Sequence, residues 1–452
     1  MSTTIAAIST PQGEGGIGVV RISGSQARTV ADRIFKSKSG KKITDTEGYH
    51  ALFGCVYDNE STIDEAVALV FAAPKSYTGE DVVEISVHGG IYVTRACLRA
   101  ALNNGAVPAA AGEFTRRAYQ NGKLGLVEAE SVMSIISAVG KQELSLALAA
   151  KSGRIGREIS AVRELLLSAA ASMAVWADYP DEELPETDID YISGLLRDAG
   201  DRLDRLIKDY DTGRLLREGV HCAIIGSPNV GKSTLMNLLS GDECSIVTEV
   251  AGTTRDVVEE TVRVGDVLLR LADTAGVRET DDLVESIGVK RAFARAETAQ
   301  LILAVFDGSR ELCDDDRRIL SLIKDKTAIA VINKTDKPQL LDISPFSSLN
   351  TVFISAATGE GRQELTAAVA EAVGANSLRG DVAVLTSERQ RLCAEAARKY
   401  VFEALDTLAA GFTLDAVGVC TDSALEALLE LTGERVTDTV ADEVFSRFCV
   451  GK

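Results

Sequence analysis

Three patterns of apolar and polar positions follow one another along the chain. Up to residue 118, short apolar runs such as "IGVVRISG", "EAVALVFAA" and "DVVEISVHG" are separated by Gly and Pro, as in the strands of a compact α+β domain. Residues 119–216 carry longer stretches with helical periodicity, for example "SAVRELLLSAAASMAVWAD". These patterns predict an α+β domain over 1–118 and the first part of a helical domain over 119–216.

The third pattern begins near Gly219. Apolar, strand-like segments from "VHCAIIGS" to "TVFISAATG" alternate with helical stretches, which is typical of a doubly wound α/β domain with a largely parallel sheet. Helical periodicity returns after about residue 380, in "SERQRLCAEAARKYVFEALDTLAAG". We therefore predict a multidomain α/β + α protein. An α/β domain over 217–378 interrupts the helical domain, whose second part covers 379–452.

Composition and charge narrow the class of protein. A chain of 452 residues is too long for one core, and its formal net charge of −19 disfavours generic binding along nucleic acid. No apolar run reaches the roughly 18 residues of a membrane helix. The eight Cys and three His have no spacing typical of disulfides or metal sites. We expect a cytoplasmic protein without a membrane segment, which meets any RNA through a local patch or a second protein.

The segment "IIGSPNVGKST" contains the pattern G-x-x-x-x-G-K-S between a strand-like and a helix-like run. Glycines allow backbone N–H groups to close around phosphate oxygens, and a helix N-terminus adds a favourable dipole. Lys232 would reach the β- and γ-phosphates, and the Ser233 hydroxyl would bind magnesium (Mg²⁺). Such a match also arises by chance, so further motifs are needed.

Three motifs at predicted strand ends supply that support. In "DTAG" an Asp can hold the Mg²⁺ shell and a Gly N–H can contact the γ-phosphate, while "SAA" can help to fix the base. In "NKTD" the Asp336 carboxylate can accept two hydrogen bonds from guanine, whose exocyclic amine adenine lacks. The chain is therefore predicted to bind GTP. The residues predicted from these motifs are Asn229, Val230, Gly231, Lys232, Ser233, Thr234, Asp273, Thr274, Ala275, Gly276, Asn333, Lys334, Asp336, Ser355, Ala356 and Ala357.

One expected catalytic residue is missing. Ras-type GTPases place a water-orienting Gln after the DxxG glycine, where this chain has Val277. Hydrolysis must therefore use another residue, an arginine, a partner chain or a cation. Nearby candidates are Arg255, Arg278, Glu279 and Glu285, and for each the alternative is an ordinary solvated charge.

With these motifs, the chain resembles the MnmE (TrmE) family of tRNA-modification GTPases. The likeness includes "GGIGVVRISG", "TGEDVVEISVHGG", "AGEFTRRAYQNGKL" and the ending "FSRFCVGK". It implies an N-terminal folate-binding domain that forms a homodimer, a discontinuous helical domain and an inserted Ras-like P-loop GTPase domain. It also implies G domains that pair when GTP and potassium (K⁺) are bound.

The resemblance further implies a reaction. With the flavoprotein MnmG, in a heterotetramer or larger assembly, the family installs an aminomethyl or carboxymethylaminomethyl group at C5 of the wobble uridine of certain tRNAs. A tetrahydrofolate derivative such as 5-formyltetrahydrofolate is associated with the one-carbon supply.

Several residue roles follow from the resemblance alone. Glu285 matches the glutamate that orients the attacking water, and Thr254 matches the threonine that completes Mg²⁺ coordination beside Ser233. The K⁺ ligands would be Asn229, Thr248, Thr253 and the backbone carbonyl of Val250. The same segment adds to the GTP-binding residues Thr248, Glu249, Val250, Ala251, Gly252, Thr253 and Thr254. Folate contacts would be Arg21, Glu84, Lys123 and Lys452.

The residues assigned to the folate site suit that ligand chemically, but the segment around Lys123 departs from the family pattern. Its cations suit the carboxylates of a glutamate tail, and its carboxylate suits the N–H donors of a pterin. For Arg21 or Glu84 taken alone, a structural surface ion pair is the default interpretation. Where the family usually reads "KLDL", this chain reads "KLGL", so that Gly125 replaces an acidic residue beside Lys123.

Three other functions compete with this interpretation. The segment "GEGGIG" spells the dinucleotide pattern with Gly13, Gly15 and Gly18, but a β-like run follows where a helix is needed. A GTPase that acts as a ribosome-assembly factor would carry the same four nucleotide motifs. The helical zones could also serve as a scaffold for docking a partner.

The tail "CVGK" has its own alternatives. Gly and Lys do not suit a prenylation signal, and a disulfide is disfavoured in the cytosol. A buried structural cysteine remains an alternative. The resemblance favours a functional Cys449 near the folate site, with Lys452 promoting the thiolate.

Overall fold

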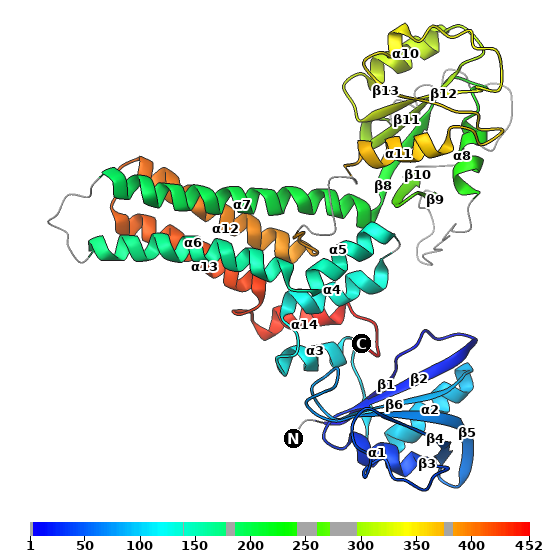
Figure 1. Cartoon of the computed structure of the whole chain (residues 1–452), viewed down its shortest axis with the longest axis vertical. Coiled ribbons are helices and arrows are strands. Elements are labelled where there is room, and N and C mark those ends of the chain that lie inside the picture. The colour runs from blue at the N-terminus through cyan, green and yellow to red at the C-terminus, as the bar shows by residue number, and fades with distance from the viewer. Residues whose placement is uncertain (1–2, 139, 178–185, 242–259, 272–295, 375–382) are drawn as a thin grey trace. The chain divides into compact units, whose positions relative to one another are not determined.

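The computed structural model describes residues 3–138, 140–177, 186–241, 260–271, 296–374 and 383–452. It contains a seven-stranded sheet, a six-stranded sheet and a set of long helices (Figure 1), so the predicted fold class is confirmed. The chain separates into two compact units. One comprises Met1–Met133, Lys151–Ala199 and Leu392–Lys452, and the other Ser134–Ala150 and Gly200–Arg391. The domain limits predicted above remain predictions.

The seven-stranded sheet forms the N-terminal α+β region. Its strand order is β3-β4-β5-β6-β2-β1-β7, and every neighbouring pair is antiparallel except β1 with β7. Its strands are β1 (Ile5–Ile8), β2 (Gly15–Ser23), β3 (Phe35–Ser37), β4 (His50–Asp58), β5 (Ser61–Phe71), β6 (Val82–Gly89) and β7 (Val107–Pro108).

Helices α1 (Ala27–Ile34) and α2 (Ile91–Asn103) pack on this sheet. Alternate residues of β2, Val20 and Ile22, are buried in a core with Val30 of α1 and Cys97 of α2. Strand β2 begins at Gly15, so "GEGGIG" leads directly into a strand. The dinucleotide-binding alternative requires a helix at this point and is therefore wrong.

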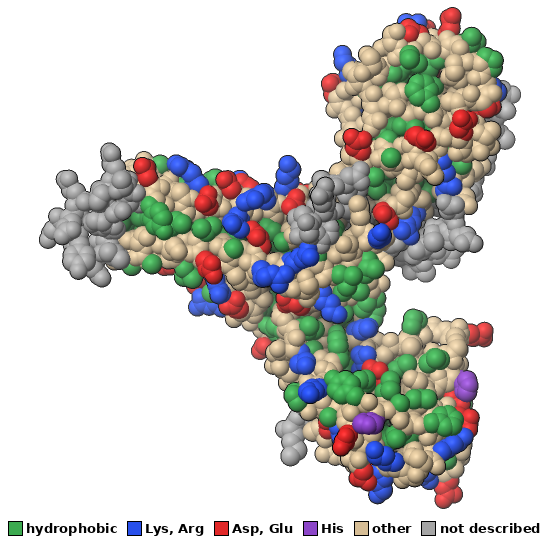
Figure 2. All heavy atoms as spheres, viewed as in Figure 1, with side chains coloured by type: hydrophobic (Ala, Val, Ile, Leu, Met, Phe, Trp, Pro, Cys, Tyr) green, Lys and Arg blue, Asp and Glu red, His purple; other side chains and the backbone are tan. Residues whose placement is uncertain are grey.

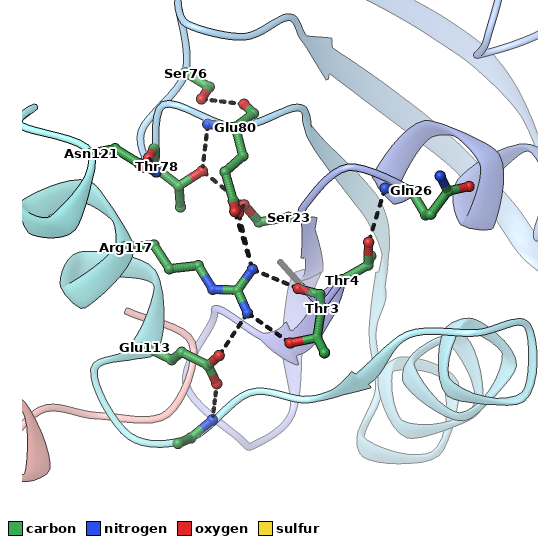
Figure 3. A network of polar contacts seen from close by, with 11 residues as sticks. Thr3, Thr4, Ser23, Gln26, Ser76, Thr78, Glu80, Glu113, Arg117 and Asn121 are labelled. Carbon is green, nitrogen blue, oxygen red and sulfur yellow. Dashed lines mark hydrogen bonds and ion pairs between the residues drawn. The ribbon is translucent and has the colours of Figure 1, made fainter. Parts of the chain in front are cut away.

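A buried arginine fixes helix α3 (Glu113–Gln120) to this sheet region (Figure 3). The Arg117 side chain is 9% exposed and pairs with Glu80 at 3.1 Å and Glu113 at 2.8 Å. It also donates to the carbonyl of Thr3 at 2.7 Å. Buried charges need such partners, because an unpaired one is costly. The network ties together the segment just before β1, the loop before β6 and α3.

Helices from before and after the six-stranded sheet pack together in one unit. On α6 (Arg154–Ala177) the buried Ile155, Ile159, Val162 and Leu166 recur with helical spacing, and α6 lies against α13 (Leu414–Thr432). Helix α4 (Leu126–Ser137) shares a core with α14 (Asp438–Ser446). The chain also contains α5 (Lys141–Lys151), which belongs almost entirely to the other unit, and α7 (Glu186–Glu218) and α12 (Glu388–Ala409), each of which has residues in both units.

Two properties of these helices bear on whether the protein can cross a lipid bilayer or attract a polyanion. None of the helices that the structure describes is both long and apolar enough to cross a lipid bilayer. On the face drawn in Figure 2, positive and negative side chains are interspersed over the helices, as they are over the N-terminal sheet region. A mixed surface of this kind gives little generic attraction for a polyanion.

The six-stranded sheet forms the α/β region, with strand order β13-β12-β11-β8-β10-β9. Among the neighbouring strand pairs that the structure describes in this sheet, β9 pairs with β10 in antiparallel fashion and the other pairs are parallel. Its strands are β8 (Val220–Ile225), β9 (Glu260–Val264), β10 (Val267–Leu271), β11 (Leu301–Asp307), β12 (Ala328–Asn333) and β13 (Asn350–Phe353). Its helical segments are α8 (Lys232–Ser240), α10 (Asp314–Ile323), α11 (Arg362–Ala372) and the short 3₁₀ helix η2 (Ser344–Phe346).

Strand β11 is central and buried along its whole length. Leu303 and Val305 belong to one apolar core, while Ile302, Ala304 and Phe306 belong to another. This alternation places a core on each face of the sheet, as a doubly wound domain requires. The carboxyl ends of the parallel strands meet at one edge, where polar residues follow them.

Candidate functional site

The P-loop segment connects β8 to α8 at this edge. A Cβ atom added to Gly226 would lie 2.5 Å from the carbonyl oxygen of Val305, so the loop passes too close to β11 for any side chain there. Gly231 is the N-cap of α8 with φ +99°, and an added Cβ would lie 2.2 Å from Nδ2 of Asn333. The two motif glycines therefore occupy positions where a side chain would collide with β11 or with Asn333.

The P-loop lysine points back over its own loop. Its Nζ donates to the carbonyl of Gly226 at 2.9 Å and to that of Ser227 at 2.8 Å. Burial lowers the pKa of Lys232, because the ammonium is partly removed from water. An anionic group bound in the loop would counter this cost. Ser233 and Thr234 follow in the first turn of α8, and both are exposed.

The "NKTD" and "SAA" segments join the P-loop through side-chain hydrogen bonds. Asn333 donates from Nδ2 to the carbonyl of Val230 at 2.8 Å and accepts from the backbone N–H of Ala356 at 2.9 Å. Lys334 donates from Nζ to the carbonyl of Asn229 at 2.8 Å. Three predicted motifs that are far apart in the sequence are thus brought together.

The Asp336 carboxylate is exposed and held by one neighbour. The Ser355 hydroxyl donates to its Oδ1 at 2.6 Å. This hydrogen bond lowers the pKa of Asp336 below its ordinary value, so the group is an anion at neutral pH. An oriented carboxylate beside the P-loop is an acceptor suited to two adjacent N–H donors.

Several predicted residues fall outside the described residues. They are Thr248, Glu249, Val250, Ala251, Gly252, Thr253, Thr254, Arg255, Asp273, Thr274, Ala275, Gly276, Val277, Arg278, Glu279 and Glu285. The predicted Mg²⁺ and K⁺ ligands within the described part are Ser233 and Asn229. Oxygen donors of this kind suit hard cations.

Two acidic residues of this site were not predicted. Asp307 ends β11 and accepts from Lys334 Nζ at 2.6 Å. Burial raises its pKa, but hydrogen bonds from Lys334 and Ser309 outweigh that effect and keep the pKa below its ordinary value. Asp316, in the first turn of α10, accepts from the Ser227 hydroxyl at 2.5 Å. An Asp directly after an apolar strand is a signal that could have indicated Asp307.

Three of the four predicted folate residues lie around the end of the chain. Arg21 on β2 pairs with Glu84 on the adjacent β6, with Nε and Oε1 2.8 Å apart, and its guanidinium carbon lies 5.4 Å from the ring centres of Tyr77 and Phe114. Arg21 also donates to the carbonyl of Gly451 at 3.3 Å. Burial and the charge of Arg21 lower the pKa of Lys452.

The fourth residue and the sequence departure lie nearby in the chain. Lys123 donates from Nζ to the carbonyl of Pro74 at 3.1 Å. A Cβ added to Gly125 would lie 2.3 Å from a carboxylate oxygen of Glu128. An acidic side chain at 125 would therefore need Glu128 to move.

Backbone contacts hold the tail in place. The N–H of Phe114 donates to the carbonyl of Lys452 at 3.1 Å, and Ala111 forms an antiparallel bridge with Val450. Gly451 has φ +98°, and an added Cβ would lie 2.3 Å from the carbonyl oxygen of Ile8. Phe448 is buried, whereas Cys449 is exposed. The alternative of a buried structural cysteine is therefore wrong for Cys449.

Known proteins match this chain over its whole length. Residues 4–123 match the family model described as "GTP-binding protein TrmE N-terminus", and residues 126–449 match "MnmE helical domain". A relative from Geobacter metallireducens is 42% identical over 100% of both chains, and one from Lactococcus lactis subsp. cremoris is 40% identical over 99% of this chain and 98% of its own. Both relatives carry the name "tRNA modification GTPase MnmE".

Solved structures match only part of the chain. Era of Aquifex aeolicus is 29% identical over 40% of this chain and 66% of its own, with a TM-score of 0.25. The G domain of FeoB from T. maritima is 23% identical over 34% of this chain and 98% of its own, with a TM-score of 0.26. These scores are too low to support a functional comparison.

Proposed function

Because the chain belongs to the MnmE family of tRNA modification GTPases, we propose that its GTPase cycle drives modification of the wobble uridine of certain tRNAs. With the flavoprotein MnmG, it would install an aminomethyl or carboxymethylaminomethyl group at C5, using a tetrahydrofolate one-carbon unit. The observation that carries the proposal is the Asp336 carboxylate, held by Ser355 beside the joined P-loop and "NKTD" segments. That arrangement suits guanine, and family membership favours tRNA modification over ribosome assembly.

The proposal includes an assembly and a place in the cell. The chain would act as a cytoplasmic homodimer bound to MnmG, with residues 1–118 as the folate-binding and dimerisation domain and 217–378 as the G domain. Arg21, Glu84, Lys123 and Lys452 would hold the folate, and Glu285 would orient the attacking water. Mg²⁺ and K⁺, bound beside the phosphates, would offset the negative charge that develops during phosphoryl transfer.

Nucleoside mass spectrometry of bulk tRNA tests the proposed function. We would compare a strain that lacks the chain with the same strain carrying the full chain on a plasmid. The C5-modified wobble uridine should disappear in the first strain and return in the second. If the modification persists without the chain, the function is wrong and the ribosome-assembly alternative becomes the leading one.

Potassium should control the rate of GTP hydrolysis. Val277 cannot orient water, so hydrolysis needs other help. A K⁺ ion held by Asn229, Thr248, Thr253 and the carbonyl of Val250 would supply the positive charge that an arginine finger provides in other GTPases. We expect turnover in KCl to exceed turnover in NaCl at equal ionic strength by roughly tenfold or more, since cationic groups at this position contribute large factors. Phosphate release in the two salts measures this, and equal rates would contradict the K⁺ assignment.

The Arg21→Gln variant should bind 5-formyltetrahydrofolate more weakly, by roughly tenfold or more, because a charged donor to the ligand is lost. Isothermal titration calorimetry measures the affinity. Lys38→Gln is a matched control, since Lys38 also pairs with a glutamate, Glu65, and lies 4.5 Å from an aromatic ring centre, that of Phe53. If Arg21→Gln lowers the melting temperature but leaves folate affinity unchanged, the Arg21–Glu84 pair is structural only.

A further inference from the structure

Asp316 lies outside the four nucleotide motifs, yet it is among the most buried charged residues that the structure describes, at 1% exposed. It stands in the first turn of α10. Its Oδ2 accepts from the backbone N–H of Cys313 at 3.1 Å and pairs with Nη1 of Arg310 at 2.8 Å. These two contacts cap the helix and balance the charge.

The other carboxylate oxygen is directed at the P-loop. Oδ1 accepts from the hydroxyl of Ser227 at 2.5 Å, and Ser227 is itself buried. Burial raises the pKa of Asp316, but hydrogen bonds from Ser227, Cys313 and Arg310 outweigh it and keep the pKa below its ordinary value. The acceptor is therefore a carboxylate, and hydrogen bonds to charged groups are stronger than neutral ones.

Ser227 connects this carboxylate to the P-loop lysine. Its backbone carbonyl is one of the two that accept from Lys232 Nζ, at 2.8 Å. A shift of Ser227 would therefore move the carbonyl against which the ammonium is placed. Since phosphate contacts depend on position within about half an ångström, such a shift would weaken nucleotide binding.

The same segment holds the loop at a second point. Asp307, at the start of the stretch that leads to α10, pairs with Lys334, whose Nζ donates to the carbonyl of Asn229. Ser227 and Asn229 lie on either side of Pro228 within the loop. The segment 307–316 thus contacts the P-loop directly at one residue and through Lys334 at another.

We propose that Asp316 is a positioning residue of the nucleotide site, which acts through the Ser227 hydroxyl to hold the P-loop and Lys232 in their binding arrangement. This inference rests on the nucleotide-binding function proposed above. It assigns to α10 a role in nucleotide affinity beyond its packing against the sheet.

The test uses the full-length protein and a fluorescent GDP analogue. Ser227→Ala removes the hydroxyl but leaves the cap of α10 intact, and it should weaken GDP binding roughly tenfold, as expected for one hydrogen bond to a charged group. Ser227→Thr keeps a hydroxyl and should retain most of the affinity. Asp316→Asn should resemble Ser227→Ala. Asp315→Asn, which alters a half-buried neighbour paired with Arg318, is the matched control and should bind GDP normally.

A double variant separates positioning from stability. If Asp316 acts through Ser227, Ser227→Ala combined with Asp316→Asn should bind GDP no more weakly than the weaker single variant. Normal GDP affinity in folded Ser227→Ala would overturn the inference, even where its melting temperature falls. Additive losses in the double variant would also overturn it. If the unaltered chain fails to bind GDP, the proposed function itself is wrong, which is a separate outcome.

Discussion

Replacing Asp336 with asparagine is expected to weaken GTP binding by about 10²–10³-fold and to confer binding of xanthosine triphosphate. The carboxylate can accept from both guanine N–H groups, whereas an asparagine amide turns a donor toward one of them. Xanthine carries a carbonyl in place of the guanine amine, so the amide matches it. The Ser355 hydroxyl, 2.6 Å from Oδ1, can still orient the amide oxygen.

Competition against a fluorescent GDP analogue measures both affinities, and phosphate release measures turnover of each nucleotide. Asp342→Asn is the control, because the exposed Asp342 carboxylate likewise accepts from a serine hydroxyl, that of Ser344 at 2.7 Å. Its affinity for GTP should not change. Retention of tight GTP binding by Asp336→Asn would mean that the base is recognised elsewhere.

The Cys449→Ser variant should lose the wobble-uridine modification while hydrolysing GTP at the normal rate. The tail is held by backbone hydrogen bonds and by the buried Phe448. Exchanging sulfur for oxygen on the exposed Cys449 should therefore leave the conformation of the tail unchanged. What changes is nucleophilicity, because the sulfur of a cysteine is intrinsically a stronger nucleophile than the hydroxyl oxygen of a serine.

Mass spectrometry of tRNA nucleosides from complemented strains measures the modification, and purified protein gives the rate of GTP hydrolysis. Cys420→Ser, which changes a half-buried cysteine of α13, is the matched control and should restore the modification. Full restoration by Cys449→Ser would assign a structural role to the tail and leave only the GTPase-linked part of the proposal.

The sequence predicted the features that depend on short-range pattern. Alternating and helical periodicity located the sheet and helix regions, and the glycines of the P-loop stand where the backbone passes against Val305 and Asn333. The composition of the tail "CVGK" also indicated a candidate functional cysteine, Cys449. Each of these signals lies within a few consecutive residues.

Features that depend on tertiary contacts could not be predicted in this way. The pairing of Ser227 with Asp316 joins residues 89 positions apart, and Arg21 meets the carbonyl of Gly451 across 430 positions. Arg117 appeared in the sequence as one of many arginines, although its network fixes α3 (Figure 3). A buried ion network has no local pattern of its own, because its members are distributed over separate elements.

The packing of α6 against α13 imposes an order on how the chain can fold during synthesis. Arg163 and Glu434, which pair across this region, are 271 positions apart, and residues 200–391 are made between them. Helix α6 therefore leaves the ribosome long before α13 exists, so the apolar positions that face α13 are not yet covered by it. The six-stranded sheet, by contrast, closes within its own stretch of chain. Translation thus completes the nucleotide domain before the helices on either side of it can pair with one another.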